Sequence, residues 1–478
     1  MKKILMISCI LILASFHARA AENDSLIQAA RDHLAGMKYS EALKTLKPLE
    51  EADSLNPEVL YIKAEVYLVY GMDKFRAYME KLSHTGNREY YDILKLKHLL
   101  FIGSSEFDDL LPEALGKYPE NPELQFCKWL NELTRGDYEG CRRSAGTVSS
   151  LMLMKCMPYL ALYYHSWDHD HNLALQYLDT LESMAGEFYG SRDREVLNLL
   201  SGHNTIPSED SLIELPFSWC GPGMGFYLLD EKGDSVKIEI DTGTGYGLMT
   251  IHDLEKGESI YGKDVLTIPD GIQYNYMKNP EDLHYKISKL SLPDYGQLIF
   301  GYFNGQFTKA DGCSSPFVFK GHALHMDPVN EKVWLRSREN MENYISMNRE
   351  KLDIIPYELR NGWIYIPCRI NGREVKMMIE TGSRDINFNP LSADYLGLKP
   401  YESTLMWNGE DYPVNKIDCS IEIGRTSYEV KGGLISDFVL GNWYYGVGSA
   451  GDIGPDFLRK HAFIIDPFDH RFILINED

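Results

Sequence analysis

An internal repeat constrains the fold of this chain more than any other feature of its sequence. The string VKIEIDTGTG at 236–245 returns as VKMMIETGSR at 375–384, which begins 139 residues later. The same offset places PFVFKGHALHMDPVNEKVWL at 316–335 over PDFLRKHAFIIDPFDHRFIL at 455–474. Two separate blocks that share one offset indicate a duplicated structural unit. Residues 211–340 and 341–478 are therefore predicted to form two related lobes.

In each copy an apolar strand pattern runs into an acid, a threonine and a glycine. The acid is Asp241 in the first copy and Glu380 in the second. Glycine lets the backbone turn sharply, and threonine can form hydrogen bonds across an interface between lobes. Each lobe is thus expected to present one carboxyl group on a tight turn. The residues expected to support the two acids are Thr242, Gly243, Thr244, Thr381, Gly382 and Ser383.

These residues resemble the signatures of the aspartic peptidases, in which each of two related lobes carries Asp-Thr-Gly or Asp-Ser-Gly after an apolar strand. AGDIGPDFL at 450–458 is similar to the second signature of that family, in its retropepsin-like form. The sequence departs from the family twice: Glu380 replaces an Asp, and CSSP at 313–316 replaces the loop that contains a glycine. The resemblance implies a mostly β, bilobal acid-protease fold and endopeptidase activity, with no cofactor and no metal.

The chemistry of this reaction explains why the acids come in a pair. Two carboxyl groups about 3 Å apart cannot both ionise, so the pair holds one proton. The ionised group can take a proton from water, and the protonated group can donate a hydrogen bond to the substrate carbonyl. Asp241 and Glu380 are the predicted catalytic residues. An isolated Asp-Thr-Gly would be an ordinary turn, so the prediction depends on the repeat.

The extra methylene of Glu380 leaves two alternatives open, because a misplacement of about 1 Å can cost about 100-fold in rate. In one, the fold is a non-catalytic module that binds an extended peptide by strand addition. In the other, Asp241 pairs with Asp241 of a second copy of the chain.

Residues 21–205 are predicted to form an all-α helical repeat domain. Apolar residues recur three and four positions apart, which is typical of amphipathic helices. Glycines recur at intervals of 32 to 35 residues, at Gly36, Gly71, Gly103 and Gly136. Asn-Pro pairs at 56–57 and 121–122 indicate helix starts. The pattern is similar to a degenerate tetratricopeptide array, which implies a docking surface for a protein partner. The polar stretch at 201–211 predicts that this arm and the lobes are separable.

Residues 1–20 are predicted to be a signal peptide: MKK precedes an apolar run at 4–16 and a cleavage site after Ala20. The mature protein is expected to be periplasmic or extracellular and to contain no transmembrane segment. Lipidation of Cys9 is a less favoured alternative, because few apolar residues precede it. The net charge of −22 argues against nucleic acid and anionic membranes as partners. A peptide or protein substrate is the expected ligand.

Other motifs are assigned structural roles. HSWDHDH at 165–171 matches no specific zinc spacing and is predicted to be a solvated loop. His322 and His461 occupy equivalent repeat positions, which favours a structural role for both. Turns at 269–271 and 407–409 are predicted to form hairpin flaps over a substrate cleft.

Overall fold

The structure is a computed structural model that describes most of the chain. The described residues are 23–34, 38–70, 72–135, 140–141, 170–185, 212–230, 232–244, 248–250, 264–267, 273–276, 287–292, 296–303, 310–319, 321–360, 363–383, 385–407, 410–435 and 448–476. The predicted signal peptide and the polar stretch at 201–211 lie outside these residues.

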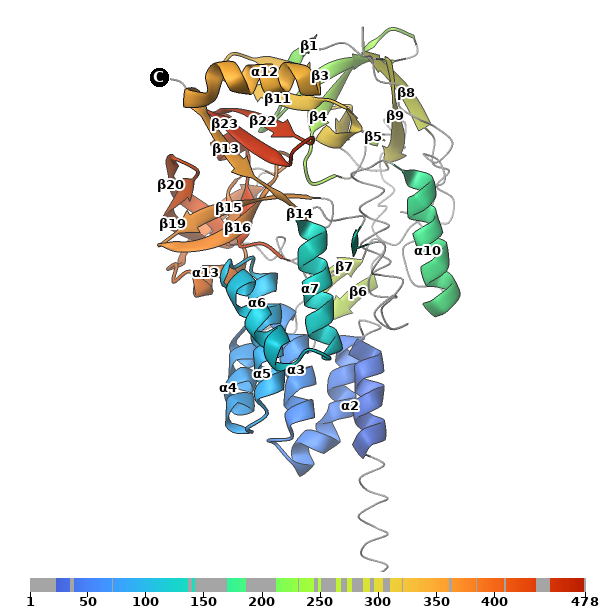
Figure 1. Ribbon diagram of the computed structural model, residues 1–478, viewed down its shortest axis with the longest axis vertical. Coiled ribbons are helices and arrows are strands. Elements are labelled where there is room, and N and C mark those ends of the chain that lie inside the picture. Colours follow the sequence, from blue (N-terminus) through green and yellow to red (C-terminus); the bar gives the residue numbers. More distant parts are fainter. Residues whose placement is uncertain are drawn as a thin grey trace, which may run out of the picture. The chain divides into compact units, whose positions relative to one another are not determined.

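The N-terminal part consists of helices and the rest is largely β, which confirms the predicted fold class (Figure 1). A first helix covers residues 23–34. It is followed by α2 (Tyr39–Ala52), α3 (Pro57–Tyr70), α4 (Met72–His84), α5 (Arg88–Phe101), α6 (Glu106–Lys117), α7 (Pro122–Thr134) and α10 (His171–Ala185).

The helices recur in pairs, as the glycine and Asn-Pro spacing predicts. The helices α2, α4 and α6 start at residues 39, 72 and 106, and α3 and α7 start directly after Asn56 and Asn121. The side chain of Asn121 accepts hydrogen bonds from the backbone N–H groups of Glu123 and Leu124, at 2.9 and 3.2 Å. Asn56 caps α3 in the same way, with the following proline at the first helical position.

The β region contains the strands β1 (Leu212–Leu215), β2 (Phe217–Cys220), β3 (Gly223–Leu229), β4 (Ser235–Ile240), β5 (Leu248–Thr250), β6 (Asp264–Thr267), β7 (Gln273–Tyr276), β8 (Ile287–Leu292), β9 (Gly296–Phe303), β10 (Gly312–Ser314), β11 (Ala323–Asp327), β12 (Lys332–Arg336), β13 (Leu352–Pro356), β14 (Glu358–Arg360), β15 (Trp363–Ile370), β16 (Arg373–Ile379), β17 (Asn387–Phe388), β18 (Tyr401–Trp407), β19 (Glu410–Ile423), β20 (Thr426–Ile435), β21 (Gly451–Ile453), β22 (Ala462–Asp466) and β23 (Arg471–Ile475). Its helices are α12 (Arg338–Asn348), α13 (Pro390–Tyr395) and α14 (Pro455–Leu458), with short 3-10 turns at Pro316–Val318 and Arg349–Lys351.

One sheet joins the two copies of the repeat. Its strand order among the described residues is β1-β12-β11-β22-β23-β13, so the second half mirrors the first. At its centre β11 and β22 are antiparallel, and His325 lies opposite Ile464. These two residues are 139 positions apart, like the repeat itself, so the sheet has a pseudo-twofold axis at this pair. The repeat is therefore structural, as predicted.

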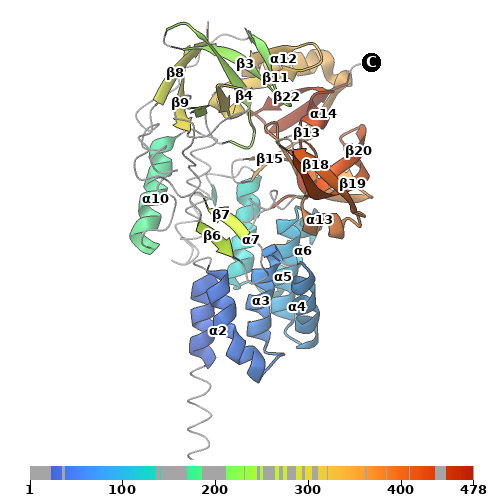
Figure 2. The same cartoon turned by 180° about the vertical axis from the view of Figure 1, so that it is seen from behind.

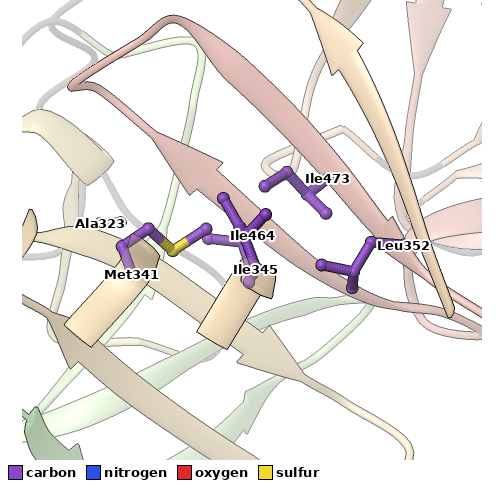
Figure 3. Packing of buried hydrophobic residues seen from close by; sticks show 6 residues of the cluster. All are labelled: Ala323, Met341, Ile345, Leu352, Ile464 and Ile473. Atoms are coloured by element: carbon purple, nitrogen blue, oxygen red, sulfur yellow. The ribbon is translucent and has the colours of Figure 1, made fainter. Parts of the chain in front are cut away.

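A helix between the lobes covers this sheet. Met341 and Ile345 of α12 are buried against Ile464 of β22, and Figure 3 shows the three side chains together. The full buried cluster is Ala323, Met341, Ile345, Leu352, Ile464 and Ile473. Ser337 caps the helix by accepting a hydrogen bond from the N–H of Asn340 at 3.3 Å. The helix α12 thus helps to hold both lobes.

Each lobe has a further sheet that carries one of the two acids. In the first lobe β3 and β4 form a hairpin, and β10 runs parallel to β4. In the second lobe β15 and β16 form a hairpin, and β21 runs parallel to β16. Each of β4 and β16 therefore has its hairpin partner on one side and a parallel strand on the other. Both acids follow a strand that is paired on its two sides.

The predicted flap positions fall at hairpins. The strands β6 and β7 pair around 268–272, and β18 and β19 pair around 408–409. Residues 269–271 and 408–409 lie outside the described part of the chain, and Trp407 ends β18. Figure 2 shows β18 next to β19 and β20. Closure of these hairpins over a substrate remains a prediction.

The chain divides into two compact units. One of them consists of Leu99–Pro112, Glu120–Ile260 and Asn279–Asp478, and it contains both Asp241 and Glu380. This unit includes the turn between α5 and α6, residues 102–105, which we call the arm turn. Its Ser104 forms an antiparallel bridge with Val375 of β16, and Gly103 accepts a hydrogen bond from the N–H of Lys376 at 2.7 Å.

The domain boundaries predicted from the sequence remain a prediction. No helix in the described residues is long and apolar enough to cross a membrane.

Candidate active site

Asp241 and Glu380 occupy equivalent places at the ends of β4 and β16. The N–H of Asp241 donates to the carbonyl of Ser314 at 3.0 Å, and the N–H of Glu380 donates to the carbonyl of Ile453 at 3.1 Å. Ser314 and Ile453 end the parallel strands β10 and β21. The same backbone bond therefore fixes each acid in its lobe.

The two threonines interlock across the lobe interface. The hydroxyl of Thr381 accepts a hydrogen bond from the N–H of Thr242 at 3.0 Å and donates to the carbonyl of Ile240 at 2.7 Å. The hydroxyl of Thr242 accepts from the N–H of Thr381 at 3.0 Å and donates to the carbonyl of Ile379 at 2.6 Å. Both threonines are fully buried. This reciprocal network fixes the two acid-bearing turns relative to each other.

Each glycine of the motif lies against the carboxyl group of the opposite lobe. A Cβ atom on Gly243 would lie 2.2 Å from Oε2 of Glu380. A Cβ atom on Gly382 would lie 2.8 Å from Cγ of Asp241. Only glycine leaves room for these contacts. Asp241 and Glu380 therefore meet within one chain, as predicted, and the first lobe needs no second copy to supply a partner acid.

The longer side chain of Glu380 reaches the same kind of backbone donor as Asp241. Oδ1 of Asp241 accepts from the N–H of Gly243 at 2.8 Å, and Oε1 of Glu380 accepts from the N–H of Gly382 at 2.9 Å. The extra methylene is thus absorbed without loss of the equivalent bond.

The two carboxyl groups form a hydrogen-bonded pair, which we call the dyad. Burial raises the pKa of Asp241, and the hydrogen bonds from Gly243 and from Glu380 oppose this rise. Burial raises the pKa of Glu380 well above its usual range, and the charge of Asp241 raises it further. The hydrogen bond thus favours the ionised form of Asp241 and the protonated form of Glu380. Both pKa values are therefore raised, and that of Glu380 lies well above its usual range.

Two further acids lie beside the dyad and were missed from the sequence. Burial, followed by the charge of Asp241, raises the pKa of Glu239 to about 8. Burial raises the pKa of Asp452 to about 7. The signal that could have found them is a break in the repeat, because Glu239 is equivalent to Met378, and Asp452 to Cys313. An acid present in only one copy is not required by the shared fold.

The remaining predicted site residues support the turns. The N–H of Thr244 donates to the carbonyl of Asp241 at 3.2 Å, and the hydroxyl of Ser383 donates to the carbonyl of Asp385 at 3.1 Å. The indole N–H of Trp363 in the second lobe donates to the carbonyl of Gly243 at 2.7 Å. This contact between lobes has no sequence signal, because the repeat places Met224 at the equivalent position.

The departure at CSSP has a structural explanation. Ser315 takes the place of Gly454, and its hydroxyl accepts a hydrogen bond from the N–H of Phe317 at 3.3 Å. In the second lobe a Cβ atom on Gly454 would lie 2.3 Å from the carbonyl oxygen of Asp385. Glycine is therefore needed at position 454, because the backbone of Asp385 passes close to it.

The described residues contain no group of three His, Cys, Asp or Glu side chains placed to hold a metal ion. Of the HSWDHDH motif only Asp170 and His171 are described, and Asp170 caps α10 by accepting from the N–H of Leu173 at 3.0 Å. His461 lies against the ring of Phe457, with 4.4 Å between centroids.

Comparisons with known proteins place the chain in no family. No family model and no curated protein matches it. Among solved structures it is similar to basic 7S globulin from soybean, at 11% identity and a TM-score of 0.32, over 56% of this chain and 95% of that one. It is also similar to a retropepsin-like aspartic protease from Rickettsia conorii, at 27% identity and a TM-score of 0.19, over 26% of this chain and 90% of that one. Both TM-scores are low.

Proposed function

We propose that the protein is an aspartic-type endopeptidase whose catalytic residues are Asp241 and Glu380. The observation that supports this proposal is the approach of the two carboxyl groups, each against the glycine of the opposite lobe. A protein that only needed a stable turn would have no reason to place two acids against each other, because like charges this close disfavour ionisation of both.

In the proposed reaction each carboxyl group has one role. Asp241, ionised, takes a proton from a water molecule whose oxygen attacks the carbon of the scissile peptide bond. Glu380, protonated, donates a hydrogen bond to the carbonyl oxygen and then transfers its proton to it. The bond from carbon to nitrogen breaks as the amine takes the proton from Asp241, and Glu380 recovers a proton from the hydroxyl group of the intermediate. The dyad returns to its initial state with one proton.

The test is cleavage of a peptide library by the wild type and by variants of the dyad between pH 4 and 8. We expect Asp241→Asn and Glu380→Gln to abolish cleavage, because each removes one of the two roles. Glu380→Asp should retain or increase it, because aspartate shortens the side chain by one methylene. The matched control is Asp411→Asn, which changes an exposed acid of β19 by the same chemistry.

The results separate the proposal from its alternative. Cleavage that survives Asp241→Asn contradicts the dyad assignment. Absence of cleavage by both the wild type and Glu380→Asp favours a non-catalytic peptide-binding module. One observation supports that alternative: β18 ends its sheet, so among the described residues one edge of this strand has no neighbour. An extended peptide bound there would add a strand.

We further propose that the protein is exported and that its helical arm docks a substrate or partner protein. The sequence of the first 20 residues supports export, and the paired helices support docking. N-terminal sequencing of the mature protein should find Ala21 or a close neighbour, and a mature chain that begins at Met1 would contradict export.

A further inference from the structure

Asp452 lies directly beside the dyad on the strand that supports it. In the parallel pairing of β21 with β16, Asp452 is opposite Met378, two residues before Glu380. Because side chains alternate along a strand, residues 378 and 380 point to one face, and Asp452 shares that face. The next residue, Ile453, accepts the backbone N–H of Glu380 at 3.1 Å.

The carboxyl group of Asp452 is buried and only half satisfied. The side chain is 3% exposed. Its Oδ2 accepts a hydrogen bond from Nδ2 of Asn387 at 3.1 Å, whereas its Oδ1 has no hydrogen-bond partner. In the described part of the chain no lysine or arginine forms an ion pair with it. A buried acid without a cation costs the fold stability. Such acids are typical of functional sites.

The repeat shows that this acid is not required by the architecture. The equivalent position in the first lobe is Cys313, opposite Glu239 of β4. Each lobe therefore has one acid in this cross-strand pair, but on different strands. Burial, followed by the negative charges around it, raises the pKa of the Cys313 thiol well above its usual range, so only the second lobe places an ionisable acid on this strand.

The charged groups that face Asp452 are acidic. Glu380 lies at the end of β16, with Asp241 beyond it, and Asp385 lies just before β17. Lys376 shares the face of β16, but its ammonium group is held by Glu358 at 2.6 Å and by Asp108 at 3.4 Å. When Asp452 ionises, its charge therefore acts on Glu380 without a nearby neutralising partner, and it raises the pKa of that carboxyl group.

On the basis of the proposed dyad, we propose that Asp452 is a positioning residue that keeps the shared proton on Glu380, leaves Asp241 ionised as the base, and extends the activity toward neutral pH. Because burial raises the pKa of Asp452 to about 7, this carboxyl group gains its charge only near neutral pH. Its effect is therefore absent at low pH and grows where Glu380 would otherwise lose its proton.

The test is the pH profile of kcat/KM for Asp452→Asn, a change that keeps the shape of the side chain and an acceptor for Asn387. We expect values within about twofold of the wild type at pH 5, and an alkaline limb that lies about one pH unit lower, in line with the effect of a like charge close by. At any pH on the alkaline limb this shift corresponds to a loss of about tenfold. The matched control is Asp456→Asn, an exposed acid four residues further on, whose profile should not move. An unchanged profile, or an equal loss at every pH, would overturn the proposal.

A second measurement does not depend on activity. Carboxyl ¹³C titration of the full-length protein, with the Glu380 signal identified by its loss in Glu380→Gln, reports the proton on Glu380 directly. Its midpoint should fall by about one pH unit in Asp452→Asn and stay constant in Asp456→Asn. An unchanged midpoint contradicts the role of Asp452. If the wild type cleaves nothing but the midpoint shifts, the endopeptidase proposal fails and the role of Asp452 in holding the proton stands.

Discussion

The side chain of Thr242 and the backbone of Thr381 are joined by a hydrogen bond that is repeated in the opposite sense. The hydroxyl of each threonine accepts from the backbone N–H of the other, and both bonds are 3.0 Å long. The two lobes are therefore fastened at the residues that follow the acids. Any movement of one lobe relative to the other must first break these buried bonds.

Replacing a threonine by valine should weaken this junction. Thr381→Val keeps the shape but leaves the buried N–H of Thr242 and the carbonyl of Ile240 without their partner. We expect a loss of about 1–3 kcal/mol in the free energy of unfolding for such unsatisfied groups. Urea unfolding measures it. Thr381→Ser keeps the hydroxyl group and should cost clearly less; an equal loss for serine and valine would show that the hydrogen bonds are not the cause.

Replacing Gly382 by alanine should separate the two carboxyl groups. The new methyl group would lie 2.8 Å from Cγ of Asp241, closer than atoms pack. A displacement of about 1 Å at a catalytic group is expected to cost about 100-fold in kcat. The control is Gly116→Ala, where a Cβ atom meets nothing within 4 Å. The measurement is peptide cleavage by the two variants at equal folded fraction. Equal activities would contradict the close approach of Gly382 to the carboxyl group of Asp241.

Much of the fold could be predicted because a duplication leaves a trace in sequence. The offset of 139 residues predicts two lobes, and it recurs in the pairing of His325 with Ile464 at the pseudo-twofold axis. Helix starts at Asn56 and Asn121 are predictable because capping is local. The pairing of the arm turn with β16 was not predictable, since it joins residues about 270 positions apart through backbone bonds that any residue types can make.

The candidate site was predictable to the extent that it is symmetric. Asp241 and Glu380, with their threonines and glycines, follow from the repeat. Glu239, Asp452 and Trp363 do not, because each occurs in one copy only and acts through its position in space. Their significance depends on their position beside the dyad in space, which no spacing along the chain encodes.

Glu239 should make the stability of the protein fall as the pH rises. Its ordinary pKa of 4.5 applies to the unfolded chain, whereas its pKa in the folded protein is about 8. Between these values the folded state binds more protons than the unfolded state, so the free energy of unfolding decreases with increasing pH. This stabilising contribution is complete below about pH 4.5 and is lost as the pH passes about 8.

Glu239→Gln removes this dependence. The free energy of unfolding of the variant, relative to the wild type, should therefore increase from about pH 4.5 to about pH 8 and level off above it. Urea unfolding over that range measures the trend. The control is Glu429→Gln, which replaces an exposed acid and should show no such slope. A relative stability that stays flat with pH would contradict the raised pKa of Glu239.

The buried lysine of β16 should contribute strongly to stability. Lys376 is 8% exposed, and its ammonium group lies 2.6 Å from Glu358, which also pairs with Arg360 at 2.8 Å. Loss of one partner of a buried ion pair costs about 3–5 kcal/mol. Lys376→Met should lie near the lower end of this range, because Arg360 still faces Glu358. Arg369→Met breaks only exposed pairs on the neighbouring strand and should cost less than about 1 kcal/mol. Equal losses in thermal or urea unfolding would refute the buried network.

The arm turn should be coupled to the strand that carries Glu380, and Gly103 is the residue that tests it. Gly103 has a φ of +68°, and a Cβ atom there would lie 2.9 Å from the carbonyl oxygen of Lys376. Gly372, at the turn before β16, has a φ of +76° but meets nothing within 4 Å. Alanine at either position is strained by about 1–2 kcal/mol, and only Gly103→Ala also pushes against β16. We therefore expect Gly103→Ala to lose more stability than Gly372→Ala and to lower kcat, because β16 positions Glu380. Equal stability and equal kcat in the two variants would show that the arm turn does not constrain the dyad.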